Sequence, residues 1–362
     1  MSMGKIVRLS TFGESHGGSI GGILEGLPPQ IPICTAQIQT ALDRRRPGQS
    51  SISTPRKETD TIQILSGIFE GKTLGTPIGF VIPNKDARSQ SYEKFKNVYR
   101  PSHADYTYDA KYGFRDWRGG GRSSARETAC RVAAGNIASQ VLQHLHGIQI
   151  RAWVEQVGTI SIPVPIDLPT IEIIDQTPVR CPDLEQAKKM ISLIEQVRKE
   201  KDTIGGIIRA ECHYVPPGLG EPVFEKIDAE LAKAMLSIPA VKGFEVGSGF
   251  AGATMRGSQH NDPFRTIDKT IQTTQNNSGG IQGGITNGMP ITFRVAFKPV
   301  ATIFMEQDTV DNNMNNTTIA PKGRHDPCVL PRAVPIVESM AALVILDMLM
   351  RQRSIQPQSF SK

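Results

Sequence analysis

The sequence predicts an α+β fold, and three observations lead to that prediction. Of its 362 residues, 38% are hydrophobic and 21% are charged, a composition typical of a globular protein with a buried core. The predicted strands and helices come in blocks and do not alternate strictly, which argues against a doubly wound parallel sheet. Residues 333–350 are apolar almost all round, which predicts a helix buried on both sides. Because no linker or convincing repeat interrupts the chain, we expect a single domain over residues 1–362.

In the first half of the chain, hydrophobic periodicity predicts three strands and one helix. Alternating residues indicate strands over 5–12, 61–66 and 78–82. A helix is expected to begin at Thr35, a good capping residue, and to end before the helix-breaking Pro47.

The second half of the chain shows clearer patterns. An amphipathic helix is predicted over 183–199 and a short helix over 228–236. Residues 204–212 predict a strand, and residues 291–297 have the clearest period of two in the chain. Residues 308–322 are polar and rich in asparagine, so we expect a loop there.

Composition excludes several classes of protein. Lys and Arg number 41 against 35 Asp and Glu, and this mild excess permits an anionic partner without requiring one. The five cysteines are scattered and include no CxxC pair, which favours reduced thiols in the cytoplasm. No stretch approaches the roughly 18 uncharged apolar residues of a membrane span, and no apolar secretory signal begins the chain. The histidines lack metal-ligand spacing, so no metal site is predicted.

The first segment that could carry chemistry is Gly13-Glu14-Ser15-His16-Gly17, which follows a predicted strand. It matches the G-x-S-x-G nucleophile elbow of serine hydrolases. An elbow is followed by a helix, however, and residues 17–26 carry five glycines. We therefore favour a tight turn that presents His16 for function, and a purely structural turn histidine is the alternative.

A run of three arginines, Arg44 to Arg46, ends the first predicted helix. Cations suit a helix C-terminus, so a structural role is open. Three consecutive side chains cannot share one helix face, and we expect at least one to face a pocket or partner. Arg56 and Lys57 add positive charge downstream.

A glycine triplet, Gly119 to Gly121, precedes Arg122 and a capping box formed by Ser124 and Glu127. A glycine-rich turn into a helix leaves free N–H donors that can bind an anion. An ordinary capped helix is the alternative, but five arginines between residues 115 and 131 favour the anion site.

The last such segment is 322–327, at the entrance to the predicted buried helix. His325 stands beside Asp326, which can orient the imidazole or raise its pKa; either residue can also cap the helix. An arginine-rich anion site with several histidines predicts acid–base chemistry on a phosphorylated or polycarboxylate small molecule.

These segments, taken in order, closely resemble the chorismate synthase family. The resemblance runs from residue 5 to about residue 353. The segments that carry it are 11–17, 42–48, 64–67, 103–108, 119–128, 218–222, 240–243 and 323–335.

The resemblance implies a lyase that converts 5-enolpyruvylshikimate 3-phosphate to chorismate and phosphate by 1,4-anti elimination, the last step of the shikimate pathway. It also implies a need for reduced FMN, which is thought to donate an electron transiently and to take up the proton, with no net redox change. The family fold is a β-α-β sandwich with helices between two antiparallel sheets, usually in a homotetramer.

The resemblance assigns catalytic roles to three residues. His16 corresponds to the histidine that assists departure of phosphate. His103 corresponds to the histidine near flavin N1, and Asp326 to the aspartate near flavin N5, a proton relay.

The resemblance also assigns two sets of ligand contacts. Substrate anions are expected at Arg44, Arg46 and Arg126. Cofactor contacts are expected at Arg45 (NADP or phosphate) and, for FMN, at Arg122, Ser123, Ser124, Ala240, Gly283, Lys298, Pro299, Val300, Ala301, Thr302 and Arg324.

The chain departs from the family pattern at three places, one of which is the stretch 298–302, where one serine hydroxyl found in relatives is missing. Ser51 stands where many members have an arginine, and Pro239 stands where some have an asparagine. No extra domain for flavin reduction is present, so an external flavin reductase is expected and NADPH would act only through it. A serine hydrolase and a nucleic-acid-binding module, the latter suggested by the basic charge, are the rival interpretations.

Overall fold

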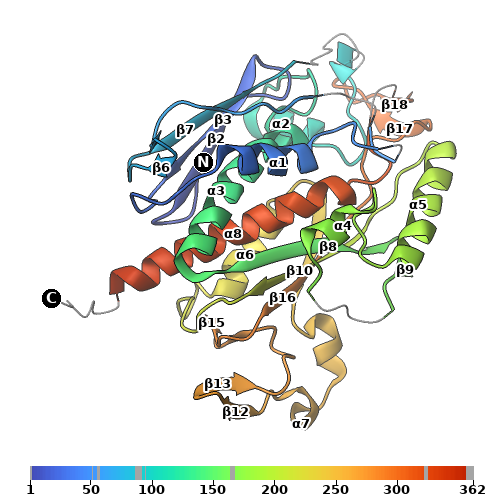
Figure 1. Ribbon diagram of the computed structural model, residues 1–362. Helices are drawn as coiled ribbons and strands as arrows, with labels where there is room; N and C mark the ends of the chain where they lie inside the picture. Colours follow the sequence, from blue (N-terminus) through green and yellow to red (C-terminus); the bar gives the residue numbers. More distant parts are fainter. Residues whose placement is uncertain are drawn as a thin grey trace.

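The structure is a computed structural model that describes residues 2–50, 52–54, 58–85, 92–93, 95–163, 168–321 and 325–355. Helices and antiparallel strand pairs occur in blocks along the chain, so the predicted α+β class is confirmed (Figure 1).

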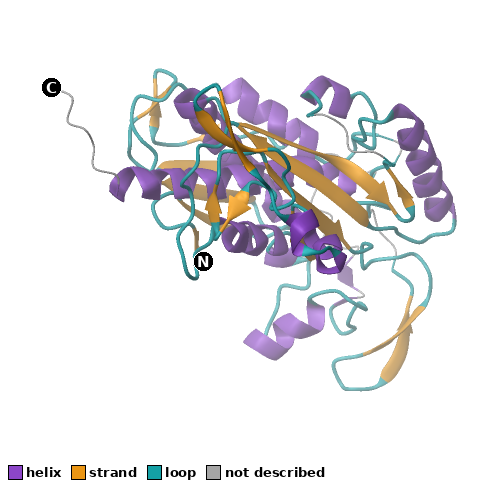
Figure 2. Cartoon of the chain, turned by 90° about the horizontal axis from the view of Figure 1, so that it is seen from below, coloured by secondary structure: helices purple, strands orange, loops and turns teal. Residues whose placement is uncertain are grey.

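Two five-stranded antiparallel sheets contain most of the strands. The N-terminal sheet has the order β1 (Ser2–Met3), β2 (Arg8–Phe12), β3 (Ser19–Glu25), β7 (Ile78–Pro83) and β4 (Gln63–Ile64). The C-terminal sheet has the order β11 (Val241–Val246), β16 (Ile291–Phe297), β10 (Gly206–His213), β8 (Gln149–Val157) and β9 (Ile160–Ser161). Seen from below, long helices run alongside the strands (Figure 2).

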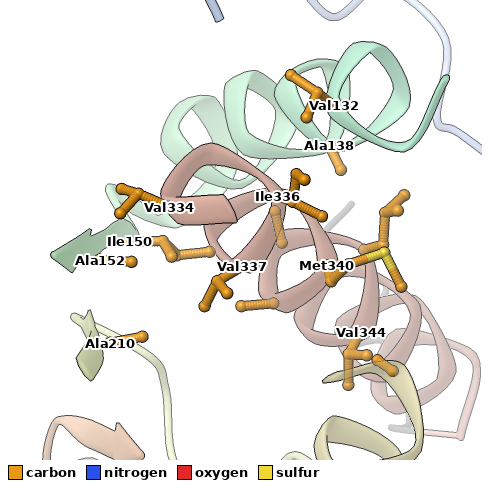
Figure 3. Close-up of a cluster of buried hydrophobic side chains, with 14 of the residues drawn as sticks. Val132, Ala138, Ile150, Ala152, Ala210, Val334, Ile336, Val337, Met340 and Val344 are labelled. Carbon is orange, nitrogen blue, oxygen red and sulfur yellow. The ribbon is translucent and has the colours of Figure 1, made fainter. Parts of the chain in front are cut away.

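Three helices form the centre of the molecule: α1 (Thr35–Arg45), α3 (Thr128–His146) and α8 (Leu330–Ile355). α3 and α8 pack against each other and against α1. α3 also contacts β2, β3 and β7 of the N-terminal sheet and β8 of the C-terminal sheet, and α8 contacts β8 and β10. Apolar side chains of α8, such as Val334 and Val337, gather there with Ile150 and Ala152 of β8 (Figure 3). Each sheet is therefore anchored to the same helical pair.

α8 extends the predicted helix at both ends. Pro331 lies in its first turn, where proline is tolerated because that N–H has no helical partner. Among the described residues, α8 alone has the length and composition that a membrane span requires, but 94% of its most apolar window is buried inside the protein. It is therefore a core helix, as its all-round apolar pattern predicts.

The predicted strand at the N-terminus begins three residues late, at Arg8. The backbone N–H groups of Lys5, Ile6 and Val7 donate instead to the carboxylate of Asp347, at 2.8–3.1 Å. Asp347 is a buried residue of α8. These backbone N–H groups, which the sequence pattern predicts to bond within a sheet, are thus satisfied by a side chain more than 300 residues away.

The prediction of a loop over 308–322 is wrong for the part of this segment that the structure describes. A hairpin forms there from β17 (Gln307–Val310) and β18 (Asn316–Ile319). Both of its strands consist mainly of polar residues, so the sequence lacks the hydrophobic alternation that would predict them. The carboxylate of Asp311 accepts the N–H groups of Asn313 and Asn315 and closes the turn.

Most other predicted elements are present. The helix over 183–199 is α5 (Leu184–Lys199), which Asp183 caps, and that over 228–236 is α6 (Ile227–Leu236). The strand over 61–66 is confined to β4.

The remaining elements are β5 (Ile68–Phe69), β6 (Lys72–Thr73), α2 (Asp105–Tyr112), the 3-10 turns η2 (Gly121–Ser123), η3 (Ala125–Glu127) and η4 (Gly249–Thr254), α4 (Ile171–Asp175), α7 (Gly257–His260), β12 (Phe264–Ile267), β13 (Thr270–Thr273), β14 (Ile281–Gln282) and β15 (Ile285–Thr286).

We predict that Gly135→Ala destabilises the protein although alanine is the better helix former. A Cβ at Gly135 of α3 would lie 2.3 Å from the Cβ and 2.6 Å from the carbonyl oxygen of Ser339 in α8. Overpacking costs about 1–3 kcal/mol, which exceeds the gain of about 0.5–1 kcal/mol in helix propensity. Urea unfolding measures the difference. Gly257→Ala, where a Cβ meets nothing within 4 Å, is the control; equal stability of the two variants would contradict the close crossing.

Candidate functional site

A cavity of about 390 Å³ opens where the end of α1, the turn before α2, the start of α3 and the start of α8 meet. Its volume lies within the range of about 300–1,000 Å³ typical of ligand pockets. Among the described residues, five cationic side chains and two carboxylates line it, together with two histidines. These are Arg45, Arg100, Arg126, Lys298 and Arg332, then Glu58 and Asp326, and His103 and His325. The lining therefore favours an anionic ligand.

The three consecutive arginines point in different directions, since successive residues of an α-helix are about 100° apart. Only Arg45 lines the cavity. Arg44 pairs with Asp175 and Glu338, and these carboxylates outweigh its burial and raise its pKa. Arg46, which caps α1, pairs with Asp43 at 3.4 Å on the surface. The structure thus brings neither Arg44 nor Arg46 to the cavity.

Arg45 and Arg126 share one buried carboxylate, that of Asp60. Arg45 donates to Asp60 Oδ2 through Nε, at 3.2 Å, and through Nη2, while Arg126 Nη1 pairs with Oδ1. Burial lowers the pKa of Arg45 to about 10 despite the opposing effect of Asp60, so its guanidinium stays charged at neutral pH. Burial raises the pKa of Asp60, but the two arginines outweigh it and hold that pKa at about 2.

Further donors of this triad also bind protein atoms. Arg126 Nε donates to Asn84 Oδ1 at 2.7 Å, and Arg45 Nη1 donates to the carbonyl of Ala125 at 3.1 Å. Fixed guanidinium groups of this kind need no reorganisation when an anion arrives.

His103 and Asp326 line the same cavity, as the resemblance implies. His103 Nδ1 lies 2.9 Å from a carboxylate oxygen of Asp105. Asp326 accepts the N–H of Thr54 at 2.9 Å and pairs with Arg332, so both of its oxygens already have protein partners.

His325 is neutral despite its position beside Asp326. Burial first, and then the charge of Arg100, lower the pKa of His325 to about 4, against the opposing effect of Asp326. Asp326 does act to raise the pKa of His325, as its position suggests, but burial and the charge of Arg100 outweigh it, so the imidazole is neutral at pH 7.

His16 lies next to the cavity and not among its lining residues. Its ring packs edge to face against Tyr92, a lining residue, with ring centroids 4.9 Å apart. A Cβ at Gly119 would lie 2.5 Å from His16 Cδ2, and Gly119 has φ +87°, so only glycine permits this approach. A strand, β3, follows the Gly13–Gly17 segment, and Ser15 Oγ has no hydrogen-bond partner in the described chain; neither feature fits a nucleophile elbow.

The predicted anion cradle is built differently. Arg122 donates to the carbonyls of Gly13 and Thr11, so it holds the N-terminal sheet to the start of α3. Ser124 caps the turn by accepting the N–H of Arg126, but Glu127 binds Thr11 and does not complete the predicted capping box. Ser123 and Ser124 do line the cavity.

The C-terminal sheet supplies the opposite wall. Lys298, Val300, Ala301 and Thr302 follow β16 and line the cavity beside Pro239 and Ala240. Burial, together with the ammonium of Lys242, lowers the pKa of Lys298, which has no carboxylate partner among the described residues.

Other sequence-based assignments do not reach this cavity or cannot be placed. Pro299 lies between lining residues without lining the cavity itself, and Gly283 lies in the β14–β15 turn. Ser51, Arg56, Lys57 and Arg324 lie outside the described residues.

Sequence reasoning assigned no role to four important residues, although Arg100 and Asp105 lie in the candidate segment around His103. Asp60 and Asp105 hold cavity arginines from behind, and Arg100 and Arg332 line the cavity directly. The resemblance covers Arg332 and Asp105 without assigning them a role. An isolated aspartate such as Asp60, between two threonines, offers no local signal.

A second cavity of about 350 Å³ adjoins the first, and the two share the lining residues His103, Ala104, Gly120 and Ser123. Tyr108 and Tyr112 contribute aromatic walls. His103 therefore lines both cavities.

We predict that Asp60→Asn lowers the free energy of unfolding by about 3–5 kcal/mol, because it leaves two buried arginines without their carboxylate. Asp43→Asn, which breaks an exposed pair, should cost no more than about 1 kcal/mol. Denaturant titration measures both.

The pH dependence gives a second check on the triad. The pKa of Asp60, about 2, lies below the value of about 3.9 for an unfolded chain. Its stabilisation is therefore present above about pH 4 and is lost as the pH falls toward 2. The gap between wild type and Asp60→Asn should shrink over that interval; a constant gap would show that the carboxylate is not ionised in the fold.

Comparison with known proteins places this site in context. A family model described as chorismate synthase matches residues 7–350. The chain is 58% identical over 349 residues to the chorismate synthase of Gloeothece citriformis (strain PCC 7424), with 96% of each chain covered. It is 56% identical over 351 residues to that of Opitutus terrae, with 97% of each covered. It also matches a crystal structure of chorismate synthase with a TM-score of 0.75 and 32% identity, over 96% of this chain and 93% of that one. These matches span both sheets and every wall of the cavity, and the chain belongs to the chorismate synthase family of enzymes.

Proposed function

We propose that this enzyme converts 5-enolpyruvylshikimate 3-phosphate to chorismate and phosphate by a 1,4-anti elimination that requires reduced FMN. The observation that carries the proposal is the cavity itself, where five cationic side chains surround His103 and His325 among the described residues. The substrate bears a phosphate and carboxylates, and arginine is the side chain best suited to bind both groups.

The residues around the cavity fit FMN. Lys298 and Lys242 form a cationic pair without a carboxylate partner in the described chain, which suits a phosphate group. Ser123, Ser124, Ala240 and the segment 300–302 line the adjacent wall and would hold the rest of the cofactor. When bound, reduced FMN would supply an electron transiently and accept the substrate proton.

The protein's own groups would perform the remaining tasks. Arg126 and Arg45, fixed by Asp60, and Arg332, fixed by Asp326, would bind and orient the anionic groups of the substrate. His16 would assist departure of the phosphate as a proton donor. His103 would stabilise negative charge on the cofactor side of the cavity. Arg44 and Arg46, which point elsewhere, would not take part in this binding.

The wider organisation is proposed on similar grounds. We assign the chain the β-α-β sandwich of the family, supported by the contacts of α3 with strands of both sheets and of α8 with the C-terminal sheet. A homotetramer, an external flavin reductase and the absence of a nucleic-acid partner complete the proposal. The five free cysteines support a cytoplasmic location.

The first prediction concerns the reaction. Purified protein mixed anaerobically with chemically reduced FMN and 5-enolpyruvylshikimate 3-phosphate should release chorismate and phosphate in equal amounts, followed by absorbance and a phosphate assay. Oxidised FMN should give neither product, and NADPH without a separate reductase should not replace reduced FMN. Phosphate without chorismate, or no product while FMN is bound, would contradict the proposed reaction.

The second prediction concerns the histidines. His16→Ala and His103→Ala should each lower turnover about 100- to 10,000-fold, the usual contribution of a positioned acid–base group. Both variants should keep FMN binding and a folded state, measured by fluorescence titration and thermal unfolding. His144→Ala, at an exposed position near the end of α3, is the control and should retain full turnover. A histidine whose removal leaves turnover intact has no part in the mechanism.

A further inference from the structure

Asp105 is the first residue of α2 and one of the most heavily bonded carboxylates near the cavity. It is 4% exposed. Its Oδ1 lies 2.9 Å from His103 Nδ1 and accepts Arg100 Nη2 at 2.7 Å. Its Oδ2 accepts Arg100 Nε at 2.8 Å and the backbone N–H of Arg100 at 3.1 Å. Arg115 approaches Oδ1 at 3.5 Å. One buried carboxylate thus meets an arginine, a histidine and a second arginine.

The charge on Asp105 decides how His103 is arranged. Burial raises the pKa of the Asp105 carboxyl, but hydrogen bonds from Arg100 and His103 outweigh it and hold that pKa well below its usual range. An ionised carboxylate only accepts hydrogen bonds. His103 Nδ1 must therefore carry a proton and donate it to Asp105. No group of the described chain bonds His103 Nε2, so that nitrogen is left for a ligand.

The same carboxylate fixes the loop that carries the glycine triplet. Arg100, held by Asp105, donates through Nη2 to the carbonyl of Gly119 at 3.0 Å. Gly119 packs directly on His16. Both proposed catalytic histidines therefore depend on Asp105, one through a hydrogen bond and the other through Arg100 and Gly119.

We propose that Asp105 is the positioning residue of this site: it holds His103 with Nε2 toward the ligand and locks Arg100 against the cavity. The geometry stands independently of the reaction, whereas the effect on turnover rests on the proposed function. In this proposal Asp105 acts through its two neighbours, His103 and Arg100.

Kinetics of Asp105→Asn test the proposal. The variant should lower kcat about 10- to 100-fold, because a misplaced histidine loses much of the usual acid–base contribution. It should also raise KM, since Arg100 is loosened. In a His103→Gln background the same substitution should lower kcat by a clearly smaller factor, because the part of the loss that runs through His103 is already absent and only the part that runs through Arg100 remains. An equal loss of kcat in both backgrounds would overturn the proposal.

Asp109→Asn is the matched control. Asp109 lies one turn further along α2 and pairs with Arg115 at 3.0 Å, but it makes no contact with His103. It should leave kcat unchanged. If it lowers kcat as much as Asp105→Asn does, the effect belongs to α2 as a whole and the proposal fails.

A spectroscopic readout separates this inference from the proposed function. Solid-state NMR of protein labelled with ¹⁵N-histidine, with His103 assigned by its loss in His103→Gln, should show a protonated Nδ1 in wild type and an altered or mixed state in Asp105→Asn. Asp105→Glu, which keeps the charge and favours folding, should shift the same signal by moving the carboxylate. An unchanged His103 signal in both variants would refute the proposal. If wild type forms no chorismate, the proposed function fails, and the nitrogen signal still decides the role of Asp105.

Discussion

The close crossing of α3 and α8 is the contact on which the rest of the fold depends. It requires a residue without a side chain at Gly135, because the backbone of Ser339 occupies the space that a Cβ would need. α3 contacts strands of both sheets and α8 contacts β8 and β10, so the crossing links the two sheets. α8 also holds the N-terminal segment through Asp347, and its first turn brings Arg332 to the cavity. Packing at one crossing thus determines the position of the site.

A second constraint is electrostatic. Several guanidinium groups share one small cavity, and their mutual repulsion and desolvation would be costly without buried carboxylates. Asp60 balances Arg45 and Arg126, Asp105 balances Arg100, and Asp326 balances Arg332. Each pair holds its arginine in one direction before any ligand arrives. The carboxylates therefore serve stability and preorganisation together, since the same bonds that neutralise charge also fix geometry.

Hydrophobic periodicity predicted a strand or helix correctly where the residues that stabilise it are close to it in the sequence. The period of two over 291–297 and the capped amphipathic helix after Asp183 both appear with nearly the predicted bounds. The strand expected to begin at Lys5 begins only at Arg8, because the carboxylate of Asp347 accepts the N–H groups of the three preceding residues. The hairpin of β17 and β18 was not predicted because its strands bury little apolar surface. Such strands do not need alternating hydrophobic residues.

The sequence by itself determined the α+β class, the buried C-terminal helix, the family, and the placement of His103 and Asp326 at one site. It did so through periodicity for the fold, and through the resemblance to the family for the two site residues. Only the tertiary structure decided that Arg45 faces the cavity while Arg44 turns away, that Arg122 supports the fold, and that Asp60 and Asp105 hold the arginines. The reason is physical: a charged side chain turns toward partners from distant segments, and their positions exist only once the sheets and helices have packed.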